Sequence, residues 1–315
     1  MPGARTAPDA ASGGRGLRRS WDPGGPYDLH LSLRVLRRGP YDPTCRTGPD
    51  GFWRASRTPA GPVTLHLRRP GPGPVRAEAW GPGAEWALDR LPALLGADDD
   101  PDAFVPHHDL TRDAHRRNPG LRLVRTGLVM EALIPSVLEQ KVTTEEAFRA
   151  WRRLVRRYGE PAPGPHPELC VMPEPRTWCL IPSWEWHRAG VDGKRSATVI
   201  RAARRAPRME EAAGMELDAA LARLQAIPGI GPWTAAETLQ RSNGDPDALT
   251  VGDLHLPGIV GYALTGRRGV DDAGMLELLA PYTGQRHRAA RLILTTGRTP
   301  PRRVPRMPRG DIARL

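Results

Sequence analysis

The chain has 315 residues and carries 46 Lys and Arg against 35 Asp and Glu, a formal net charge of +11. This length suffices for one large or two medium domains with apolar cores, which excludes a peptide or a disulfide-stapled miniprotein. The sequence has neither a run of about 18 apolar residues nor an apolar signal-peptide stretch, so we expect a cytoplasmic protein without membrane contact.

The cysteine and lysine content limits the kinds of metal site and basic surface that the chain can form. The three cysteines, Cys45, Cys170 and Cys179, are spaced unlike any zinc or iron–sulfur ligand set, so we predict no metal and no other cofactor. Lys141 and Lys194 are the only lysines, and the other 44 basic residues are arginines. The positive charge is compatible with a polyanionic partner but does not identify one.

The two ends of the chain differ in composition from the rest. Residues 1–25 are rich in Gly, Ala, Pro and Arg, and we predict a disordered basic leader there. Residues 297–315 form an Arg/Pro-rich tail, for which we make the same prediction.

Residues 26–115 are predicted to form an α+β lobe with antiparallel strands. Apolar residues alternate at period two in 27–36 and in 62–69, which is typical of half-buried strands. A helical pattern follows at 84–96. A later group of His and Asp side chains, from His107 to His115, lacks metal-ligand spacing, so we interpret it as a solvated linker.

Residues 116–296 are predicted to form an all-helical domain. Apolar residues recur every three or four positions from 128 to 138, and Thr143 with Glu146 forms a capping-box pattern before a second helix that ends at Gly159. Further helices are expected near 194–206, 216–225, 232–242, 257–265, 274–280 and 287–296. The fold class is therefore an α+β lobe followed by a mainly α domain.

One segment combines a helix end, a tight turn and a helix start. Pro228-Gly229 ends the first helix, Gly231 is expected to adopt a backbone conformation that no side chain tolerates, and Pro232 suits the first position of a new helix. The unpaired N–H groups at such a helix start attract phosphate. The alternative is an ordinary turn between packed helices.

The motif from Leu224 to Ala235, L-Q-A-I-P-G-I-G-P-W-T-A, resembles the hairpin of the helix-hairpin-helix DNA glycosylase superfamily. The tryptophan after the second glycine, Trp233, is similar to the 3-methyladenine DNA glycosylase II branch in particular. Asp253 follows Trp233 by twenty residues, where that family has its catalytic aspartate. The resemblance covers about residues 26–296, although Val35 and Gln285 stand where the branch has aromatic residues.

The resemblance implies a monofunctional DNA glycosylase of base excision repair. Such an enzyme flips a damaged nucleotide out of double-stranded DNA, hydrolyses the N-glycosidic bond of an alkylated purine such as 3-methyladenine, and leaves an abasic site. It implies Asp253 as the catalytic residue and a base pocket formed by Trp233, Leu254 and Tyr282. The implied DNA-binding residues are Gln140, Lys141, Gly229, Ile230, Gly231, Thr234 and Arg286.

The residue types suit this chemistry. A carboxylate beside C1′ stabilises the positive charge that develops on the sugar, and an indole face attracts a cationic base. Glycosylases that also cut the strand use a lysine, usually at the position of Trp233, and residues 195–315 contain no lysine. We therefore expect no lyase activity, with Lys141 as the less favoured substitute nucleophile.

Several alternatives remain open at this stage. Asp253 is also a favoured helix N-cap residue, and the turn with Gln140 and Lys141 is either the element that fills the gap left by the flipped base or a solvated surface turn. For the whole chain, the alternatives are a catalytically inactive DNA-binding or damage-sensing protein and a basic interaction protein. We expect a monomer associated with the nucleoid, with damaged double-stranded DNA as its partner.

Overall fold

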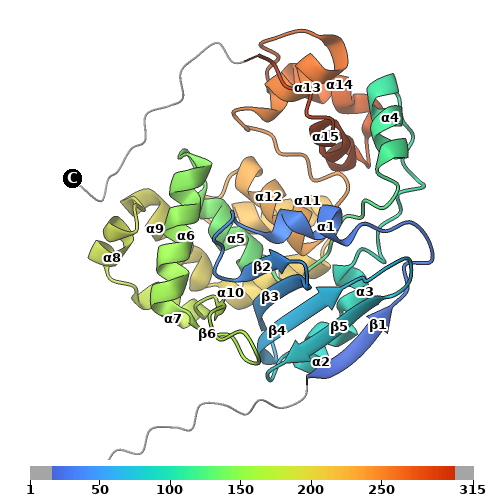
Figure 1. The fold of residues 1–315 in the computed structure, drawn as a ribbon. Coiled ribbons are helices and arrows are strands. Elements are labelled where there is room, and N and C mark those ends of the chain that lie inside the picture. The colour runs from blue at the N-terminus through green and yellow to red at the C-terminus, as the bar shows by residue number, and fades with distance from the viewer. Residues whose placement is uncertain (1–15, 302–315) are drawn as a thin grey trace, which may run out of the picture.

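The structure, a computed structural model, describes residues 16–301 and combines an antiparallel sheet with a larger body of helices (Figure 1). The predicted fold class, an α+β lobe followed by a mainly α domain, is thereby confirmed. The five strands lie in the order β1-β5-β4-β3-β2. Their bounds are β1 Leu17–Trp21, β2 Cys45–Gly48, β3 Gly51–Thr58, β4 Gly61–Arg68 and β5 Val75–Trp80.

Strand β1 corrects the prediction of a disordered leader that extends to residue 25. Leu17 pairs with Ala79 and Trp21 pairs with Val75, so β1 forms one edge of the sheet. The tertiary partner β5 thus orders a segment whose composition gives no local signal. Residues 1–15 of the predicted leader, and residues 302–315 of the predicted tail, lie outside the described part of the chain.

The alternating segment 27–36 is helical, which corrects the strand predicted there. It forms α1 (Leu29–Leu33) and the short 3-10 helix η1 (Arg34–Leu36). The carboxylate of Asp28 accepts a hydrogen bond of 2.8 Å from the amide of Leu31, which caps the helix start. The predicted strand at 62–69 and the predicted helix at 84–96 are confirmed as β4 and as α2 (Ala84–Asp89) with α3 (Leu91–Leu94).

The remaining elements are almost all helices, and their positions agree with the periodicity of the sequence. They are α4 Asp109–Arg117, α5 Val129–Leu138, α6 Thr144–Tyr158, α7 Pro175–Leu180, α8 Ser183–Arg188, α9 Gly193–Ala203, α10 Ala206–Glu210, α11 Leu217–Gln225, α12 Pro232–Ser242, α13 Leu256–Thr265, α14 Asp272–Leu279 and α15 Arg286–Thr295, with η2 Glu211–Gly214, η3 Ala280–Tyr282 and the short strands β6 Glu160–Pro161 and β7 Cys170–Val171. The capping box of α6 is present, with reciprocal bonds between Thr143 and Glu146.

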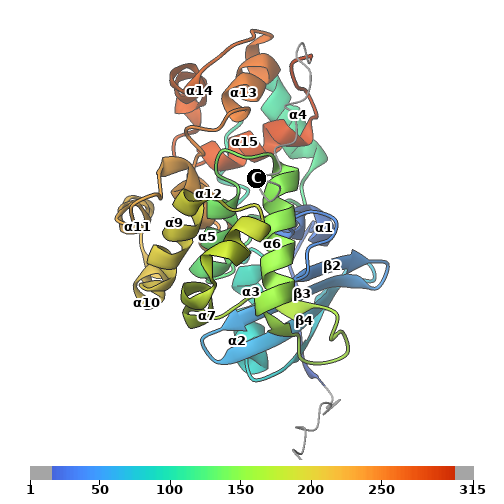
Figure 2. The ribbon, with the colours of Figure 1, turned by 90° about the vertical axis from the view of Figure 1, so that its left-hand side faces the viewer.

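Two predictions are wrong near α4. The segment from His107 to His115, predicted as a solvated linker, is largely helical, and the domain boundary predicted after residue 115 does not separate two domains. The boundary falls inside α4, which packs against α15 at the end of the molecule far from the sheet (Figure 2). His108 is tied to this end as well, because its Nδ1 lies 2.8 Å from the hydroxyl of Tyr282. The segment is therefore part of the helical body.

The apolar core divides into separate clusters of buried residues. One cluster lies under the sheet, a second joins α5, α6, α9, α11 and α12, and a third joins α4, α13, α14 and α15. The loop between α12 and α13 passes from the second cluster to the third. Among residues 16–301, no helix combines the length and apolar character that a membrane span requires.

Candidate functional site

The turn between α11 and α12 is a tight hairpin held in one conformation. The amide of Ile230 donates a hydrogen bond of 3.0 Å to the carbonyl of Ile227. Gly229 has a φ of +100°, and a Cβ at this position would lie only 2.1 Å from Oγ1 of Thr198. Glycine is thus required at 229 both by the backbone and by the close approach of α9.

Gly231 has a different role from the one predicted. Its φ of −100° and ψ of −178° are extended backbone that any residue adopts, so the predicted conformational requirement is wrong. A Cβ at Gly231 would meet no atom within 4 Å. The missing side chain therefore leaves open space directly before α12, where a ligand can approach the backbone.

The start of α12 presents free amide groups beside this space. Its first helical hydrogen bond runs from the amide of Ala235 to the carbonyl of Gly231, at 3.0 Å. The N–H groups of Trp233 and Thr234 precede it, so they have no partner within the helix. Pro228 and Gly229 are exposed, and the helix start has the positive end of the helix dipole. This arrangement suits a phosphate.

Two predicted DNA contacts in the hairpin turn inward instead. The side chain of Ile230 is buried and its amide is already bonded to Ile227, so it anchors the hairpin in the core. Thr234 is only 2% exposed, and its hydroxyl accepts a hydrogen bond of 2.7 Å from Nε2 of Gln140. These side chains position the hairpin and do not face a partner.

Gln140 and Lys141 lie in the turn between α5 and α6, next to the hairpin. Besides Thr234, Nε2 of Gln140 binds the carbonyl of Gly229 at 3.0 Å, so this side chain joins the two turns. Lys141 is exposed and has a φ of 54°. Such a left-handed backbone is strained for a residue with a side chain, and it turns the chain sharply at this position.

Trp233 and Asp253 are brought together by the tertiary structure. The indole Nε1 of Trp233 donates a hydrogen bond of 2.9 Å to Oδ2 of Asp253. The other oxygen, Oδ1, accepts hydrogen bonds of 2.8 Å from the amides of His255 and Leu256 at the start of α13. Both side chains remain partly exposed. Asp253 is thus a helix cap that also keeps one side open to solvent.

The other predicted base-pocket residues lie in opposite environments. Leu254 is 82% exposed, directly after Asp253, so it projects from the loop. Tyr282 is only 2% exposed and stacks on Phe104, with ring centroids 5.5 Å apart. Its hydroxyl also lies 2.8 Å from Oγ1 of Thr111. Tyr282 therefore belongs to the core of α4 and α15, which corrects its predicted place in the pocket wall.

Arg286 is engaged within the protein, which corrects its predicted role in DNA binding. Its guanidinium binds both carboxylate oxygens of Asp247, with 2.8 Å from Nε to Oδ1 and 2.5 Å from Nη2 to Oδ2. Its amide also binds Asp247, at 2.9 Å. Hydrogen bonding to this carboxylate raises the pKa of Arg286. A charge neutralised in this way is not free for a phosphate.

Helix α12 carries a further polar stripe that the sequence analysis missed. Trp233, Glu237 and Arg241 follow one another at four-residue steps and are the partly exposed residues after Pro232 on an otherwise buried helix. Nη1 of Arg241 binds Oε2 of Glu237 at 2.7 Å, and Nε of Arg241 binds the carbonyl of Val35 at 3.1 Å. The four-residue spacing is the signal that reveals the stripe.

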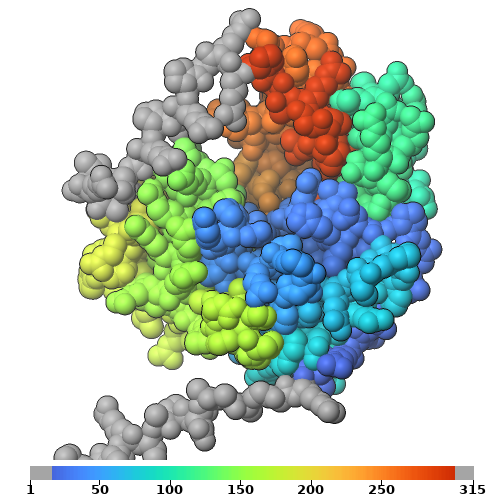
Figure 3. Space-filling model, viewed as in Figure 1, coloured from blue at the N-terminus to red at the C-terminus, as the bar shows by residue number. Residues whose placement is uncertain are grey.

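A hollow opens on this side of the molecule. In Figure 3 it lies between the green atoms around α6, the red atoms of α15 and the blue atoms of the N-terminal lobe, and orange atoms of the region around α12 form its floor. The stripe contacts two neighbouring segments, because Arg241 binds the carbonyl of Val35 in the N-terminal lobe and Trp233 binds Asp253 in the loop before α13.

Comparisons with known proteins agree with this geometry. No family model matches the chain. Over 174 residues it is 33% identical to the "probable bifunctional transcriptional activator/DNA repair enzyme AlkA" of two Mycobacterium tuberculosis strains. The match covers 54% of this chain and about a third, 35%, of the length of these curated relatives.

Solved structures of glycosylases superpose on most of the chain. A 3-methyladenine DNA glycosylase from Archaeoglobus fulgidus has a TM-score of 0.71 at 16% identity, covering 88% of this chain and 97% of its own. An 8-oxoguanine glycosylase/lyase from Clostridium acetobutylicum in complex with DNA has a TM-score of 0.66 at 11% identity, covering 86% and 92%. The chain has the helix-hairpin-helix DNA glycosylase fold. The resemblance seen in the sequence is confirmed, and the match to the DNA repair enzyme AlkA agrees with it.

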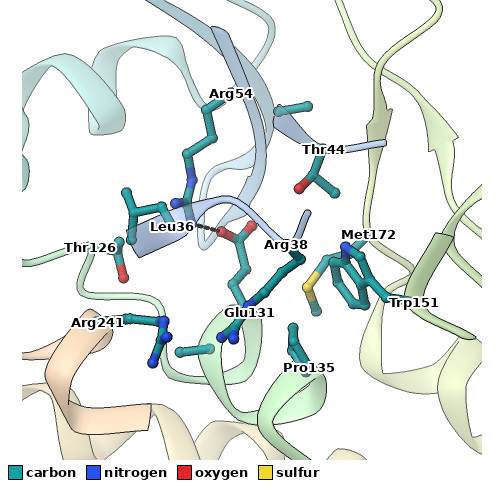
Figure 4. A pocket seen from close by; sticks show the side chains of 12 residues that line it. Leu36, Arg38, Thr44, Arg54, Thr126, Glu131, Pro135, Trp151, Met172 and Arg241 are labelled. Atoms are coloured by element: carbon teal, nitrogen blue, oxygen red, sulfur yellow. Dashed lines mark hydrogen bonds and ion pairs between the residues drawn. The ribbon is translucent and has the colours of Figure 1, made fainter. Parts of the chain in front are cut away.

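Within this glycosylase fold, a second cavity lies between the sheet lobe and α5 (Figure 4). Arg54 and Glu131 meet there at 2.6 Å, and Arg38 and Arg241 also line the cavity. Burial, together with the charge of Arg241, lowers the pKa of Arg38. The free space is about that of a water molecule, so the cavity is too small for a nucleobase. The candidate functional site is therefore the hairpin together with the stripe on α12.

Metal ligation has no support in the described part of this glycosylase fold. Between residues 16 and 301, no group of three or more His, Cys, Asp and Glu side chains converges in a way that could hold an ion.

Proposed function

We propose that this chain is a monofunctional DNA glycosylase of base excision repair that hydrolyses the N-glycosidic bond of alkylated purines and leaves an abasic site. The observation that carries the proposal is the hydrogen bond between Trp233 and the partly exposed Asp253. Trp233 lies in the first turn of α12, the helix that follows the hairpin and begins with free amide groups. The names of the relatives, a DNA repair enzyme and a 3-methyladenine DNA glycosylase, support the substrate class.

Double-stranded DNA with a damaged base is the proposed partner, bound by a monomer without a cofactor. The hairpin offers the amides of Trp233 and Thr234 beside the open space at Gly231, which suits a backbone phosphate. Lys141 and Gln140 lie in the adjacent turn, where they can fill the gap that a flipped nucleotide leaves. The formal charge of +11 favours attraction to DNA over the whole surface.

Asp253 is the proposed catalytic residue. Its Oδ1 is fixed by the amides of His255 and Leu256, so the carboxylate is oriented before a substrate arrives. A fixed carboxylate beside C1′ stabilises the oxocarbenium-like transition state, and it can orient the water that attacks the sugar. Trp233 holds Oδ2 and offers the face of its ring to the flipped base.

The absence of strand cleavage is part of the proposal. A glycosylase/lyase needs a lysine that forms a Schiff base with C1′. Trp233 stands at the start of α12, and the chain's only lysines are Lys141 and Lys194. Lys194 is the second residue of α9, where its amide binds the capping carboxylate of Asp192. We therefore expect hydrolysis with water as the nucleophile.

The experiment measures free bases by mass spectrometry after incubation of the protein with methylated duplex DNA. Wild type is expected to release methylated purines, and Asp253→Asn is expected to release them at least 100-fold more slowly. Asp271→Asn is the matched control, because Asp271 caps α14 by accepting a hydrogen bond of 2.9 Å from the amide of Gly274 and, in the described part of the chain, binds neither Trp233 nor Asp253. Equal release by wild type and Asp253→Asn overturns the proposal. Two results would overturn the prediction that the enzyme lacks lyase activity. One is strand cleavage without alkali treatment; the other is a borohydride-trapped covalent adduct with DNA that Lys141→Ala no longer forms.

One observation favours a second candidate, a catalytically inactive DNA-binding or damage-sensing protein. Both oxygens of Asp253 already accept hydrogen bonds within the protein, as in a purely structural cap. This candidate predicts lesion binding whose affinity falls steeply with salt, without release of any base. The experiment above distinguishes the two.

A further inference from the structure

Glu237 lies on the same side of α12 as Trp233, and both residues bind the loop that carries Asp253. The indole of Trp233 donates its hydrogen bond of 2.9 Å to Asp253 at one end of this loop. The hydroxyl of Thr250, three residues earlier, donates a hydrogen bond of 3.2 Å to Oε1 of Glu237. Four residues of helix rise about 6 Å, so the two bonds join α12 to the loop one helical turn apart. The carboxylates of Glu237 and Asp253 therefore lie along one seam between α12 and the loop.

A further contact fixes the direction in which the loop runs. Nε2 of Gln240 donates hydrogen bonds of 2.8 Å to the carbonyl of Ala248 and of 2.7 Å to the hydroxyl oxygen of Thr250. From residue 248 to residue 253 the loop thus passes from the last turn of α12 towards its first turn, where Trp233 lies. Glu237 is held between these contacts.

The carboxylate of Glu237 lies between Trp233 and the guanidinium of Arg241. Nη1 of Arg241 donates hydrogen bonds of 2.7 Å to Oε2 and to the main-chain carbonyl of Glu237. Helix carbonyls point towards the C-terminus, whereas Cα–Cβ bonds tilt towards the N-terminus. The guanidinium is therefore on the far side of Glu237 from Trp233, where Nε of Arg241 is also bound to the carbonyl of Val35 at 3.1 Å. The negative end of this ion pair is the end nearer to Trp233.

This carboxylate can act on a base that lies against the indole. The side chain of Glu237 is only 16% exposed, so it is largely removed from water but still reached from the surface. Charges interact more strongly in such a partly desolvated place than in water. A positive charge on the face of Trp233 is attracted by the ring and by the nearer carboxylate, whereas an uncharged base gains neither attraction.

We infer that Glu237 is a specificity-determining residue, which favours purines that alkylation has made cationic over uncharged purines of the same shape. The inference rests on the proposed glycosylase function and ranks the members of its substrate class. Asp253 keeps the role proposed above and acts on the charge that develops on the sugar. The positive charge leaves the base as the glycosidic bond breaks, so the effect of Glu237 is expected in the binding of the lesion.

Two lesions of the same shape test the inference. 7-Methylguanine is cationic in DNA, and 7-methyl-7-deazaguanine is its uncharged counterpart, in which carbon replaces the methylated nitrogen. Each lesion is placed opposite cytosine in the same duplex, on a 2′-fluoroarabino sugar that prevents release of the base during the titration. Fluorescence anisotropy gives the Kd of each duplex, and the ratio of the two Kd values is compared between variants.

Wild type is expected to bind the 7-methylguanine duplex about tenfold more tightly than the uncharged one. Glu237→Gln keeps an oxygen that accepts from Thr250 and Arg241 but loses the charge, so it is expected to lower this preference about fivefold. Arg241→Gln leaves the carboxylate without its cation and is expected to raise the preference about twofold. Glu85→Gln removes the same charge from an exposed position on α2, which packs against the sheet, and is expected to leave the preference unchanged.

The outcomes separate this inference from the proposed function. A preference in Glu237→Gln equal to that of wild type overturns the inference, because Glu237 and Arg241 are then an ordinary ion pair on a helix. An equal loss of affinity for both duplexes in Glu237→Gln also overturns it, since that result indicates a general loss of DNA binding. If wild type releases no base from methylated DNA but its preference still depends on Glu237, the proposed function fails and the recognition of the cationic base stands.

Discussion

Asp253 receives the indole hydrogen of Trp233 on one carboxylate oxygen, at 2.9 Å, and caps helix α13 with the other. The two interpretations of this aspartate, helix cap and catalytic group, are therefore compatible in one geometry. The cap fixes the direction of the carboxylate, and Trp233 links it to the hairpin. Such preorganisation is what electrostatic catalysis requires.

Stability measurements separate the two roles of Asp253. Asp253→Ala removes the cap, so we expect the free energy of unfolding to fall by about 1 kcal/mol in urea denaturation. Asp253→Asn retains an oxygen that accepts from the amides, so it is expected to lose less than half of that amount while losing activity. An equal loss of stability in both variants would contradict the capping role.

Alanine at the two hairpin glycines is expected to affect different properties: stability at position 229 and DNA binding at position 231. Gly229→Ala places a Cβ against Thr198 at a positive φ, so the free energy of unfolding is expected to fall by about 2 kcal/mol or more. Gly231→Ala has extended backbone and open space, so it is expected to fold normally but to bind duplex DNA more weakly, measured by fluorescence anisotropy.

The double variant Gly229→Ala with Thr198→Ala provides the control for this pair. It removes the hydroxyl nearest to the new methyl group and is expected to recover part of the lost stability. A Gly231→Ala protein that binds DNA as tightly as wild type would exclude a phosphate at the start of α12.

Gln140→Ala is expected to weaken DNA binding by about fivefold to tenfold. The substitution removes two hydrogen bonds, of about 1 kcal/mol each, that join the turn after α5 to Gly229 and Thr234. Gln225→Ala is the matched control, because the exposed Gln225 binds only a carbonyl of its own helix, that of Leu221. Titration of a duplex with an abasic site measures both; equal affinities would show that the link does not serve binding.

The buried His287 predicts a loss of stability in acid. Burial, with Arg291 and Arg241 nearby, lowers the pKa of His287 well below its ordinary value of 6.5. The unfolded chain therefore binds a proton near pH 6.5 that the folded chain does not, so the free energy of unfolding falls as pH drops below about 6.5. His287→Gln is expected to flatten this slope in urea titrations from pH 7 to pH 5.

His187→Gln, on the exposed surface of α8, serves as the control for the pH series. It is expected to reproduce the wild-type slope. A His287→Gln slope as steep as that of wild type would mean that other groups cause the acid sensitivity.

Much of the helical body followed from local signals in the sequence. The helix predicted at 232–242 matches α12, and the capping box of Thr143 and Glu146 marked the start of α6 correctly. Capping and the apolar period of 3.6 residues are short-range interactions, so they are visible in the sequence. The strand predicted at 27–36 failed because a single cap at Asp28 outweighed the alternation.

The amino-acid sequence by itself determined the hairpin, the order of the helices and the spacing of Asp253 from Trp233, because these depend on residues close in the chain or on a recognisable motif. Only the tertiary structure decided which side chains remain available to bind a partner. Arg286 meets Asp247 across 39 residues and Tyr282 meets His108 across 174, so charges and rings that look available are already paired. A polar group's partner is chosen by packing in space and not by position in the chain, so the sequence does not show which groups are paired.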